Sequence, residues 1–393
     1  MKHFAGLVLC GVLGGAGPAV ADGVVAASAV ADWNRITVDA VTVGRPGPIG
    51  IVDIALVQIA VHDAVQAIEK RFEPYYFELD RAHGSRSAAV AAAAHGVLVG
   101  MYPAQAPTLD PMYHSYLADK GLTGDPGVGV GEQAAAGILP LRRVNPNPLP
   151  PPFVGSNEIG VWRPTPSFLG NPPAPPPFAP MAAPWMGKLD PFTLTSPTRF
   201  RPAPPPALTS ERYKKDFNEV KALGSLTSTA RSAEQTDLAY FYSGNIPGQW
   251  NAAVRGVATR YLRRTGDQAR LLALANMATA DALISVWDSK SHYVFWRPVT
   301  AIVEAANDGN PGTEADASWQ PLINTPPYPD YSSGANSVAA AMTRTMQLFF
   351  DTDRMTFEVT TAVPEAVRKT RTYRRFSDAA ADMVEARMLL GIH

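Results

Sequence analysis

Apolar residues along the chain recur with helical spacing, and strand-like alternation is nearly absent. The longest apolar stretch, residues 49–70, includes Ile51 and Ile54 and suits a helix that is buried on most of its surface. An Ala-rich stretch over residues 85–102 predicts a second helix, which stops before Pro103. The pattern therefore predicts an all-α fold. Further helices are predicted in the 130s and over about residues 210–224, 231–244, 247–265, 267–290, 334–351 and 377–390.

Between residues 145 and 206 the helical pattern gives way to proline-rich sequence. The segments NPNPLPPPFVG, NPPAPPPFAP and RPAPPP exclude a helix or a central strand and are typical of extended, polyproline-like chain. We expect an ordered strap packed over one helical body that covers residues 22–393; the alternative is a flexible linker. The argument for order is that aromatic residues, rare in solvated linkers, interleave with the prolines: Trp162, Phe168, Phe178, Trp185, Phe192 and Phe200.

The first 21 residues have the pattern of a secretory signal peptide. Lys2 and His3 precede an apolar run, and Ala19-Val20-Ala21 is a small-x-small cleavage site. The pattern predicts export, to the periplasm or to the medium. The single cysteine, Cys10, lies within this segment, so the processed chain would contain no thiolate nucleophile or thiolate metal site. The rest of the chain has no uninterrupted run of 18 apolar residues, and we expect no transmembrane segment.

Composition narrows the function further. The chain is 46% hydrophobic and 18% charged, which excludes a disordered protein. Its net charge of −1 argues against a dedicated nucleic-acid binder. We interpret the basic run RKTRTYRR, residues 368–375, as a solvated or salt-bridged segment.

The first chemically suggestive segment contains Lys290 and Arg297, followed by Pro298. The two cations are seven residues apart, or two turns of a continuous helix, which would place them on one face beside aromatic residues. Arginine and lysine together are a common pairing for phosphate-like oxyanions. The alternative is a surface lysine and an arginine that is salt-bridged to Asp281 or Asp288.

Two further segments complete a pattern. Ser333 and Gly334 form a turn at a predicted helix start, where free backbone N–H groups favour an anion; the alternative is an ordinary serine cap. Arg387 and His393 are six apart, and Gly391 between them can end a helix and turn the histidine back toward the arginine. The alternative there is a frayed terminal histidine.

In this order, K-x6-R-P, an S-G turn and R-x5-H resemble the signature of the vanadium-dependent haloperoxidase and type-2 phosphatidic acid phosphatase superfamily. The segment GPIGIVDIALVQIAVHDAVQAI resembles the family's N-terminal buried helix, and GVWRPTPSF, ALTSERY and DTDRMTF resemble features of its exported bacterial members. The resemblance implies an α-helical bundle that cages a tetrahedral or trigonal-bipyramidal oxyanion.

The resemblance also implies a role for each residue. Lys290, Arg297 and Arg387 would bind the equatorial oxygens, and the Ser333 hydroxyl and Gly334 N–H would complete the cage. His393 would ligate vanadate in a haloperoxidase, whereas in a phosphatase it would attack phosphorus. Vanadate is therefore the implied cofactor and phosphate its competing ligand. The implied substrates are peroxide and halide, or a phosphate ester, and oligomeric state is left open.

One departure from the family concerns proton transfer. The family turn usually reads P-S-G-H, and its histidine is the acid–base residue, whereas this chain has Ala335 at that position. General acid–base catalysis is typically worth about 10² to 10⁴ in rate. We therefore expect impaired catalysis, above all for halide oxidation. His292 and Asn336 are the candidates for a substitute donor.

A second departure concerns the end of the sequence. Family members continue past this histidine and supply an aspartate that orients the imidazole, whereas the sequence given stops at His393. We expect it to be truncated; the alternative is a terminal carboxylate beside the histidine. The sequence thus favours an oxyanion-site enzyme. A degenerate phosphate- or vanadate-binding protein and a structural helical protein are the alternatives, and the three cations argue against the latter.

Overall fold

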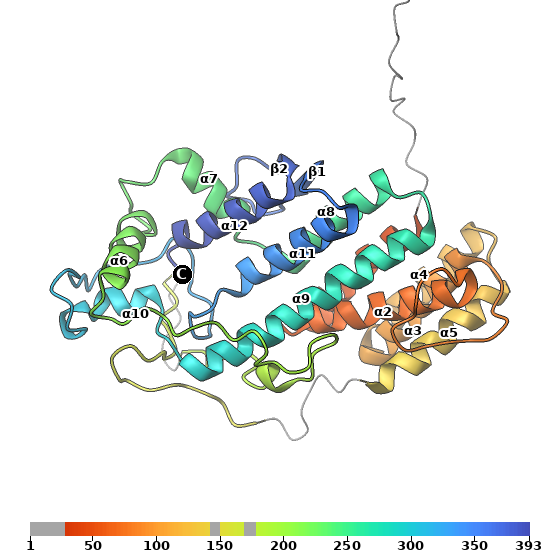
Figure 1. The fold of residues 1–393 in the computed structure, drawn as a ribbon, viewed down its shortest axis with the longest axis horizontal. Coiled ribbons are helices and arrows are strands. Elements are labelled where there is room, and N and C mark those ends of the chain that lie inside the picture. Colours follow the sequence, from red (N-terminus) through yellow and green to blue (C-terminus); the bar gives the residue numbers. More distant parts are fainter. Residues whose placement is uncertain (1–27, 142–149, 169–177) are drawn as a thin grey trace, which may run out of the picture.

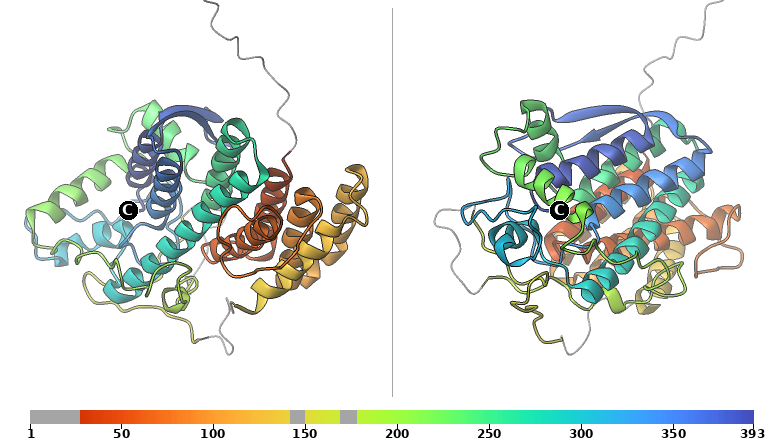
Figure 2. Two further views of the ribbon diagram at one scale, coloured as in Figure 1. Left: turned by 45° about the vertical axis from the view of Figure 1, so that its right-hand side comes forward. Right: turned by 60° about the vertical axis from the view of Figure 1, so that its left-hand side comes forward.

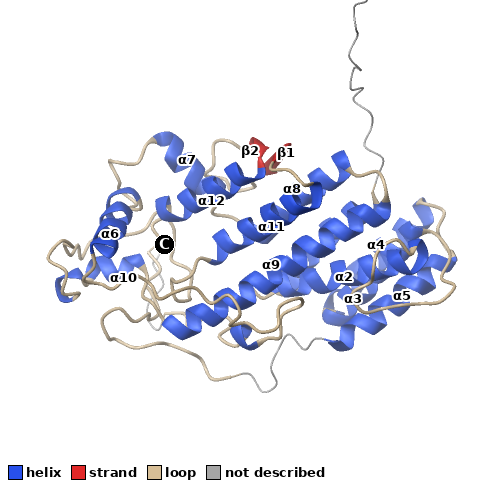
Figure 3. Cartoon of the chain, in the orientation of Figure 1, coloured by secondary structure: helices blue, strands red, loops and turns tan. Residues whose placement is uncertain are grey.

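The structure is a computed structural model that describes residues 28–141, 150–168 and 178–393. The predicted signal peptide and residues 142–149 and 169–177 of the predicted strap lie outside the described residues. Within these ranges most of the chain is helical, and a two-stranded antiparallel sheet is added at one end of the bundle (Figure 3). The prediction of an all-α bundle is confirmed.

The N-terminal half of the bundle is built around α2 (Gly50–Glu69), which is buried along nearly its whole length. It packs against α3, α5 and α9, so that apolar residues on all its sides meet other helices. This central position explains why residues 49–70 are apolar without a clear polar face. The other helices of this half are α1 (Ala29–Gly44), α3 (Arg86–Met101), α4 (Ala106–Asp119) and α5 (Pro126–Ile138), with 3-10 turns at Pro103–Gln105 and Leu139–Leu141.

The C-terminal half consists mainly of long helices that run side by side (Figures 1 and 2). The helix α9 lies against α2 on one side and α11 on the other, and α11 in turn packs on α12. The helix α9 therefore joins the two halves of the bundle. The helices of this half are α6 (Glu211–Leu223), α7 (Ala233–Phe241), α8 (Ile246–Tyr261), α9 (Thr265–Tyr293), α10 (Pro298–Val303), α11 (Gly334–Phe350) and α12 (Phe376–Leu389), with 3-10 turns at Met186–Lys188 and Ala305–Asn307.

A short hairpin connects α11 to α12. Its strands, β1 (Arg354–Thr360) and β2 (Thr370–Arg375), pair in antiparallel register, which the hydrophobic pattern did not predict. The basic run that forms β2 is held by carboxylates: Arg371 bonds Glu234 at 3.2 Å and Asp237 at 2.8 Å. The interpretation of this run as salt-bridged is therefore confirmed.

The described part of the proline-rich segment packs on the helices. The Trp162 side chain is fully buried, and the backbone N–H of this residue donates to the Val294 carbonyl oxygen at 2.7 Å. The Asp281 carboxylate on α9 accepts hydrogen bonds from the N–H groups of Phe192 and Thr193. Phe200, in contrast, is 66% exposed. These contacts fasten the segment to the C-terminal end of α9, which leads into the candidate site.

Two helices, α2 and α9, have the length and apolar composition of a membrane span. The helix α3 and the Pro103–Asp119 segment, bent by 116°, would form a third such unit if taken together. In this structure 94% of the most apolar 18-residue stretch of α2 is buried inside the molecule, and 72% of the corresponding stretch of α9 is buried. Most of this apolar surface is therefore used in packing between helices.

Candidate oxyanion site

The predicted site residues meet near the C-terminal end of the described chain, where α9, α10, α11 and α12 approach one another (Figure 1). Lys290 lies in the last turn of α9, and Arg297 immediately precedes α10. Ser333 is the N-cap of α11, and Arg387 lies in the last turn of α12. Elements that are far apart in the sequence thus bring the predicted cations together.

The prediction that Lys290 and Arg297 share one helical face is wrong in its geometry. The helix α9 ends at Tyr293, and Val294 adopts a left-handed conformation with φ of 46°, so no continuous helix joins the two residues. Backbone hydrogen bonds hold the intervening segment between the strap and the loop before α11, because Trp296 N–H donates to Gly160 and Phe295 accepts from Asp330. The two cations nevertheless converge.

Both cations are directed at the loop formed by Tyr328, Pro329 and Asp330. The Lys290 Nζ donates to the carbonyl oxygens of Pro329 at 2.6 Å and Asp330 at 2.8 Å. The Arg297 Nε donates to the Tyr328 carbonyl oxygen at 2.8 Å. The guanidinium also lies over the Tyr328 ring, 4.9 Å from its centroid, and the Lys290 ammonium is equally close. One loop therefore sets the positions of both cations.

The alternative interpretation fails for the lysine, which is not at the surface, and for the named partners of the arginine, because Arg297 pairs instead with Asp330 at 3.3 Å. Both Lys290 and Arg297 are 0% exposed. Asp281 is engaged by the strap, and Asp288 forms a bidentate pair with Arg201 at 2.7 Å. Neither of these two carboxylates is therefore the partner of Lys290 or Arg297.

The turn at Gly391 brings His393 to Arg297. The helix α12 ends at Leu389, and Gly391 has φ of 74°, a conformation that favours glycine. A Cβ at this position would lie 2.3 Å from the Gly224 carbonyl oxygen. The chain then reverses, so that the Ile392 carbonyl oxygen accepts from Arg297 Nη1 at 2.5 Å and the His393 Nε2 lies 3.4 Å from the same atom.

Sequence reasoning missed Asp330. Its carboxylate contacts His393 Nδ1 and lies 3.3 Å from Arg297 Nη1. The contact places the ring proton on Nδ1 and leaves the lone pair of Nε2 directed toward Arg297. The only signal in the sequence was an acidic residue immediately before the turn that leads to Ser333, in a segment interpreted as a cap.

The beginning of α11 contributes a third set of groups. Ser333 Oγ accepts from the Asn336 N–H at 3.5 Å, as an N-cap does, and the buried Gly334 is the first residue of the helix. Amides in the first turn of a helix have no intrahelical partner and favour negative charge. The serine is thus both an ordinary cap and the start of a potential anion site.

The two candidate substitute donors differ in their placement. His292 is exposed, packs edge-on against Tyr293, and lines neither of the cavities at the site, so the structure does not bring it to the cations. Asn336 lines the same cavity as His393, and its buried Oδ1 has no hydrogen-bond partner among the described residues. Of the two, only Asn336 reaches the site.

Two cavities open onto the site and share Arg387 as a lining residue. The first, of about 340 Å³, is lined by His393, Asp330 and Asn336 together with aromatic residues. The second, of about 490 Å³, is lined by Gly334 and Ala335 and is otherwise mainly apolar. No histidine, aspartate or glutamate is among the described residues that line the second cavity. Its other lining residues include Ile51, Ile54, Leu283, Trp287, Ile323, Pro326 and Val338.

Burial changes the ionisation of these groups. It lowers the pKa of His393 to about 3, because the contact with Asp330 does not offset burial and the nearby Arg297 charge, so the ring is neutral at pH 7. Burial also lowers the pKa of Lys290, and that of Arg387 to about 10. Burial alone would raise the pKa of Asp330, but His393 and the cations hold it below its usual value.

Some of the buried donors remain without a partner. Among the described residues, Arg297 Nη2 and Arg387 Nε are buried and make no hydrogen bond, although Arg387 Nη1 donates to the Tyr242 carbonyl oxygen at 3.2 Å. Leaving a charged donor buried and unpaired costs more free energy than leaving a neutral one. An anion held between the two guanidinium groups would satisfy both donors.

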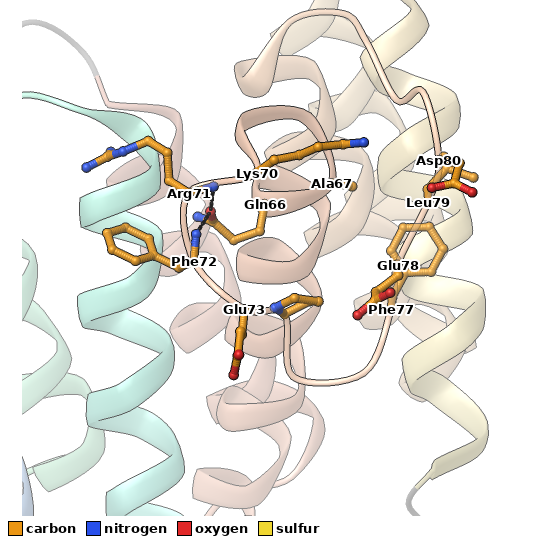
Figure 4. Close-up of a pocket in the computed structure, with 11 residues that line it drawn as sticks. Gln66, Ala67, Lys70, Arg71, Phe72, Glu73, Phe77, Glu78, Leu79 and Asp80 are labelled. Carbon is orange, nitrogen blue, oxygen red and sulfur yellow. Dashed lines mark hydrogen bonds between the residues drawn. The ribbon is translucent and has the colours of Figure 1, made fainter.

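A further cavity lies away from this site, at the other end of α2's contacts with the N-terminal helices. It has a volume of about 410 Å³ and lies where α2 ends, and there the Gln66 side-chain oxygen accepts from the N–H groups of Arg71 and Phe72 (Figure 4). His62 and Asp63 on the same helix are buried, and Asp63 accepts backbone N–H groups of the following loop. These polar groups therefore fasten the loop to α2.

Comparison with known proteins agrees with this geometry. Residues 270–393, which contain the candidate site, match the family described as the VCPO second helical-bundle domain. The vanadium chloroperoxidase of Curvularia inaequalis is 29% identical over 209 residues, 44% of this chain. That alignment spans only 34% of the fungal protein.

Solved structures extend the likeness to most of the chain. A structure described as the first bacterial vanadium-dependent iodoperoxidase superposes with a TM-score of 0.74 at 23% identity, covering 92% of this chain and 91% of its own. An apo-type bacterial vanadium-dependent chloroperoxidase gives a TM-score of 0.70 at 20% identity, covering 90% of both chains. These structures show that the chain has the vanadium haloperoxidase fold, and the match to the family is confined to residues 270–393.

Proposed function

We propose that the chain is an enzyme that binds a tetrahedral oxyanion, vanadate or phosphate, between Arg297, Arg387 and the first turn of α11. The observation that carries this proposal is the pair of buried guanidinium groups with unpartnered donors, Arg297 Nη2 and Arg387 Nε. Helix N-termini and arginine forks are both suited to such anions. Among the described residues, no group of three or more His, Cys, Asp and Glu side chains could hold a metal ion.

These residues also fit vanadate. When bound, vanadate would supply peroxide-dependent oxidation chemistry, as the names of the related proteins indicate for them. Arg297 and Arg387 would bind its oxygens through their unused donors, and His393 would present Nε2 to it. Lys290, already bonded to two carbonyl oxygens, would add positive charge at the rim.

With a phosphate monoester in the cage, the same residues support hydrolysis. The lone pair of His393 Nε2 forms a bond to phosphorus while the bond to the ester oxygen breaks, and the leaving alkoxide takes a proton from water. Water then cleaves the phosphorus–nitrogen bond and releases phosphate. Arg297 and Arg387 stabilise the charge on the equatorial oxygens in both steps. The described residues that line the apolar cavity beside Ala335 include no histidine, aspartate or glutamate as a proton donor, so esters with good leaving groups are favoured.

Peroxide-dependent halide oxidation is the second candidate, and the similarity to named vanadium haloperoxidases favours it. That reaction requires proton delivery at the bound oxyanion. Ala335 cannot carry a proton, and the exposed His292 lies outside both cavities. We therefore expect this activity to be weaker than ester cleavage.

The test is an assay of purified residues 22–393 with 4-nitrophenyl phosphate, and with bromide and hydrogen peroxide after loading with orthovanadate. The matched variant His393→Ala should keep its phosphate affinity within about threefold but lose at least about 10³ in ester hydrolysis. Equal activity in the variant would contradict the role of His393. Phosphate binding with no turnover in either chain would favour a binding protein instead.

We also propose that the protein is exported, on the strength of the signal-peptide pattern in residues 1–21. Expression of the full chain with its own N-terminus, followed by mass analysis of the periplasmic and medium fractions, tests this. A mature chain beginning at Asp22 supports export. An unprocessed chain that stays in the cytoplasm contradicts it.

A further inference from the structure

The feature that the proposed mechanism does not yet use is the buried carboxylate of Asp330. It comes from the loop before α11, whereas the family's orienting aspartate was expected beyond His393. Its Oδ1 contacts both His393 Nδ1 and Arg297 Nη1, the latter at 3.3 Å, and its own carbonyl oxygen accepts from Lys290 at 2.8 Å. One residue is thus bonded to three members of the candidate cage.

We propose that Asp330 is a positioning residue that holds His393 with Nε2 facing the cage, and that its negative charge weakens oxyanion binding there. This inference rests on the proposed function, because it assigns a role toward the same anion. The orienting carboxylate proposed here therefore comes from the loop before α11.

The orientation follows from the two ends of the imidazole. Nδ1 contacts the Asp330 carboxylate, while Nε2 lies 3.4 Å from Arg297 Nη1. A carboxylate accepts only, so it requires Nδ1 to carry the proton and leaves Nε2 free to attack. The His393 side chain is only 14% exposed, and the main chain of Ile392 is held by Arg297, so the ring has little freedom to adopt another hydrogen bond.

The effect on affinity follows from charge. Asp330 is bonded to Arg297, whose Nη2 would hold the oxyanion, so a carboxylate and the bound anion would repel each other at close range. The Asp330 carboxylate therefore favours catalysis, by orienting His393, but weakens binding of the anion in the ground state. A group that only stabilised the fold would affect both in the same direction.

The experiment measures phosphate affinity by calorimetry, and kcat with 4-nitrophenyl phosphate, for three chains. Asp330→Asn should bind phosphate about tenfold more tightly, because a negative charge is removed, and lose about 10- to 100-fold in kcat, because the imidazole is no longer oriented. Asp216→Asn is the matched control: Asp216 lines the same cavity as His393 but its side chain is 56% exposed. It should leave both quantities within about twofold.

Asp330→Glu separates charge from position and also serves if Asp330→Asn does not fold. It should keep the phosphate affinity within about threefold and still lower kcat, because its carboxylate is displaced by one methylene. Parallel losses of affinity and kcat in Asp330→Asn, or behaviour like Asp216→Asn, would overturn the inference. If the unmodified chain binds no phosphate, the proposed function fails instead, and the two failures are thereby distinguished.

Discussion

The two cavities that meet at Arg387 have opposite chemical character. The cavity with His393, Asp330 and Asn336 contains an imidazole and a carboxylate that contacts it. The cavity with Ala335 has mainly apolar walls and offers no histidine or carboxylate among its described lining residues. The comparison shows that titratable groups of the candidate site gather on one side of Arg387, whereas the wall that contains Ala335 on the other side is mainly apolar.

The largest expected effect concerns the cation at the centre of the site. Arg297→Ala removes the unpartnered Nη2 donor and the contacts to Asp330, Ile392 and Tyr328. We expect phosphate affinity to fall at least about 100-fold and stability to fall by roughly 3–5 kcal/mol, since Asp330 loses its arginine. Calorimetry and thermal melting measure the two effects. Because Arg201 pairs with Asp288 away from the site, Arg201→Ala should retain phosphate binding.

The next prediction concerns a substitution that would make the apolar cavity more like the cavity that contains His393. Ala335→His introduces a titratable group into the apolar cavity, next to Gly334. We expect hydrolysis of phenyl phosphate, a poor leaving-group ester, to rise by at least about tenfold, with a smaller gain for 4-nitrophenyl phosphate. Ala335→Asn adds a polar side chain that does not titrate and should give no comparable gain. A folded, phosphate-binding Ala335→His variant without any gain would refute the assignment of position 335 as the acid–base position.

A smaller effect tests the turn that delivers His393. Gly391→Ala forces a Cβ toward the Gly224 carbonyl oxygen and strains a positive φ. We expect a loss of roughly 1–3 kcal/mol in unfolding free energy and a lower kcat with near-normal phosphate affinity. Gly256→Ala is a matched control, because a Cβ there meets no atom within 4 Å and lies within α8; it should be neutral or stabilising. Equal behaviour of the two variants would contradict the role of the turn.

The last prediction concerns stability alone and involves the wall of the apolar cavity. Burial raises the pKa of Asp53, which supports Arg45 in that wall, from 3.8 to about 6. Because this pKa is higher in the folded than in the unfolded chain, the folded protein binds the proton more tightly. The free energy of unfolding therefore falls as the pH rises from about 4 to 6, by up to about 3 kcal/mol. Melting profiles of the native chain and Asp53→Asn should diverge over this range. Parallel profiles would show that Asp53 ionises normally.

Much of the fold was predictable from periodicity. Long apolar stretches such as residues 49–70 identify buried helices, because a helix that packs on all its sides has apolar residues throughout its own sequence. The hairpin between α11 and α12 was missed, since β2 is a basic strand whose residues are held by carboxylates from α7. Its stability comes from tertiary ion pairs that no local pattern reveals.

The site was predictable as a set of residues but not as geometry. The signature identified Lys290, Arg297 and Arg387, which the fold does bring together. The shared helical face assumed for the first two was wrong, because the left-handed Val294 ends α9 and loop contacts place Arg297. Asp330 was missed because its role depends on a contact with a residue 63 positions later in the chain, which spacing alone cannot reveal.

The most direct test of the central claim is calorimetric titration of folded residues 22–393 with phosphate and with orthovanadate, each repeated in the presence of the other. The account predicts one saturable site for which the two anions compete, since both would use Arg297 Nη2 and Arg387 Nε. Absence of saturable binding by a folded chain, or binding of the two anions without competition, would contradict the claim that these buried arginines form an oxyanion cage.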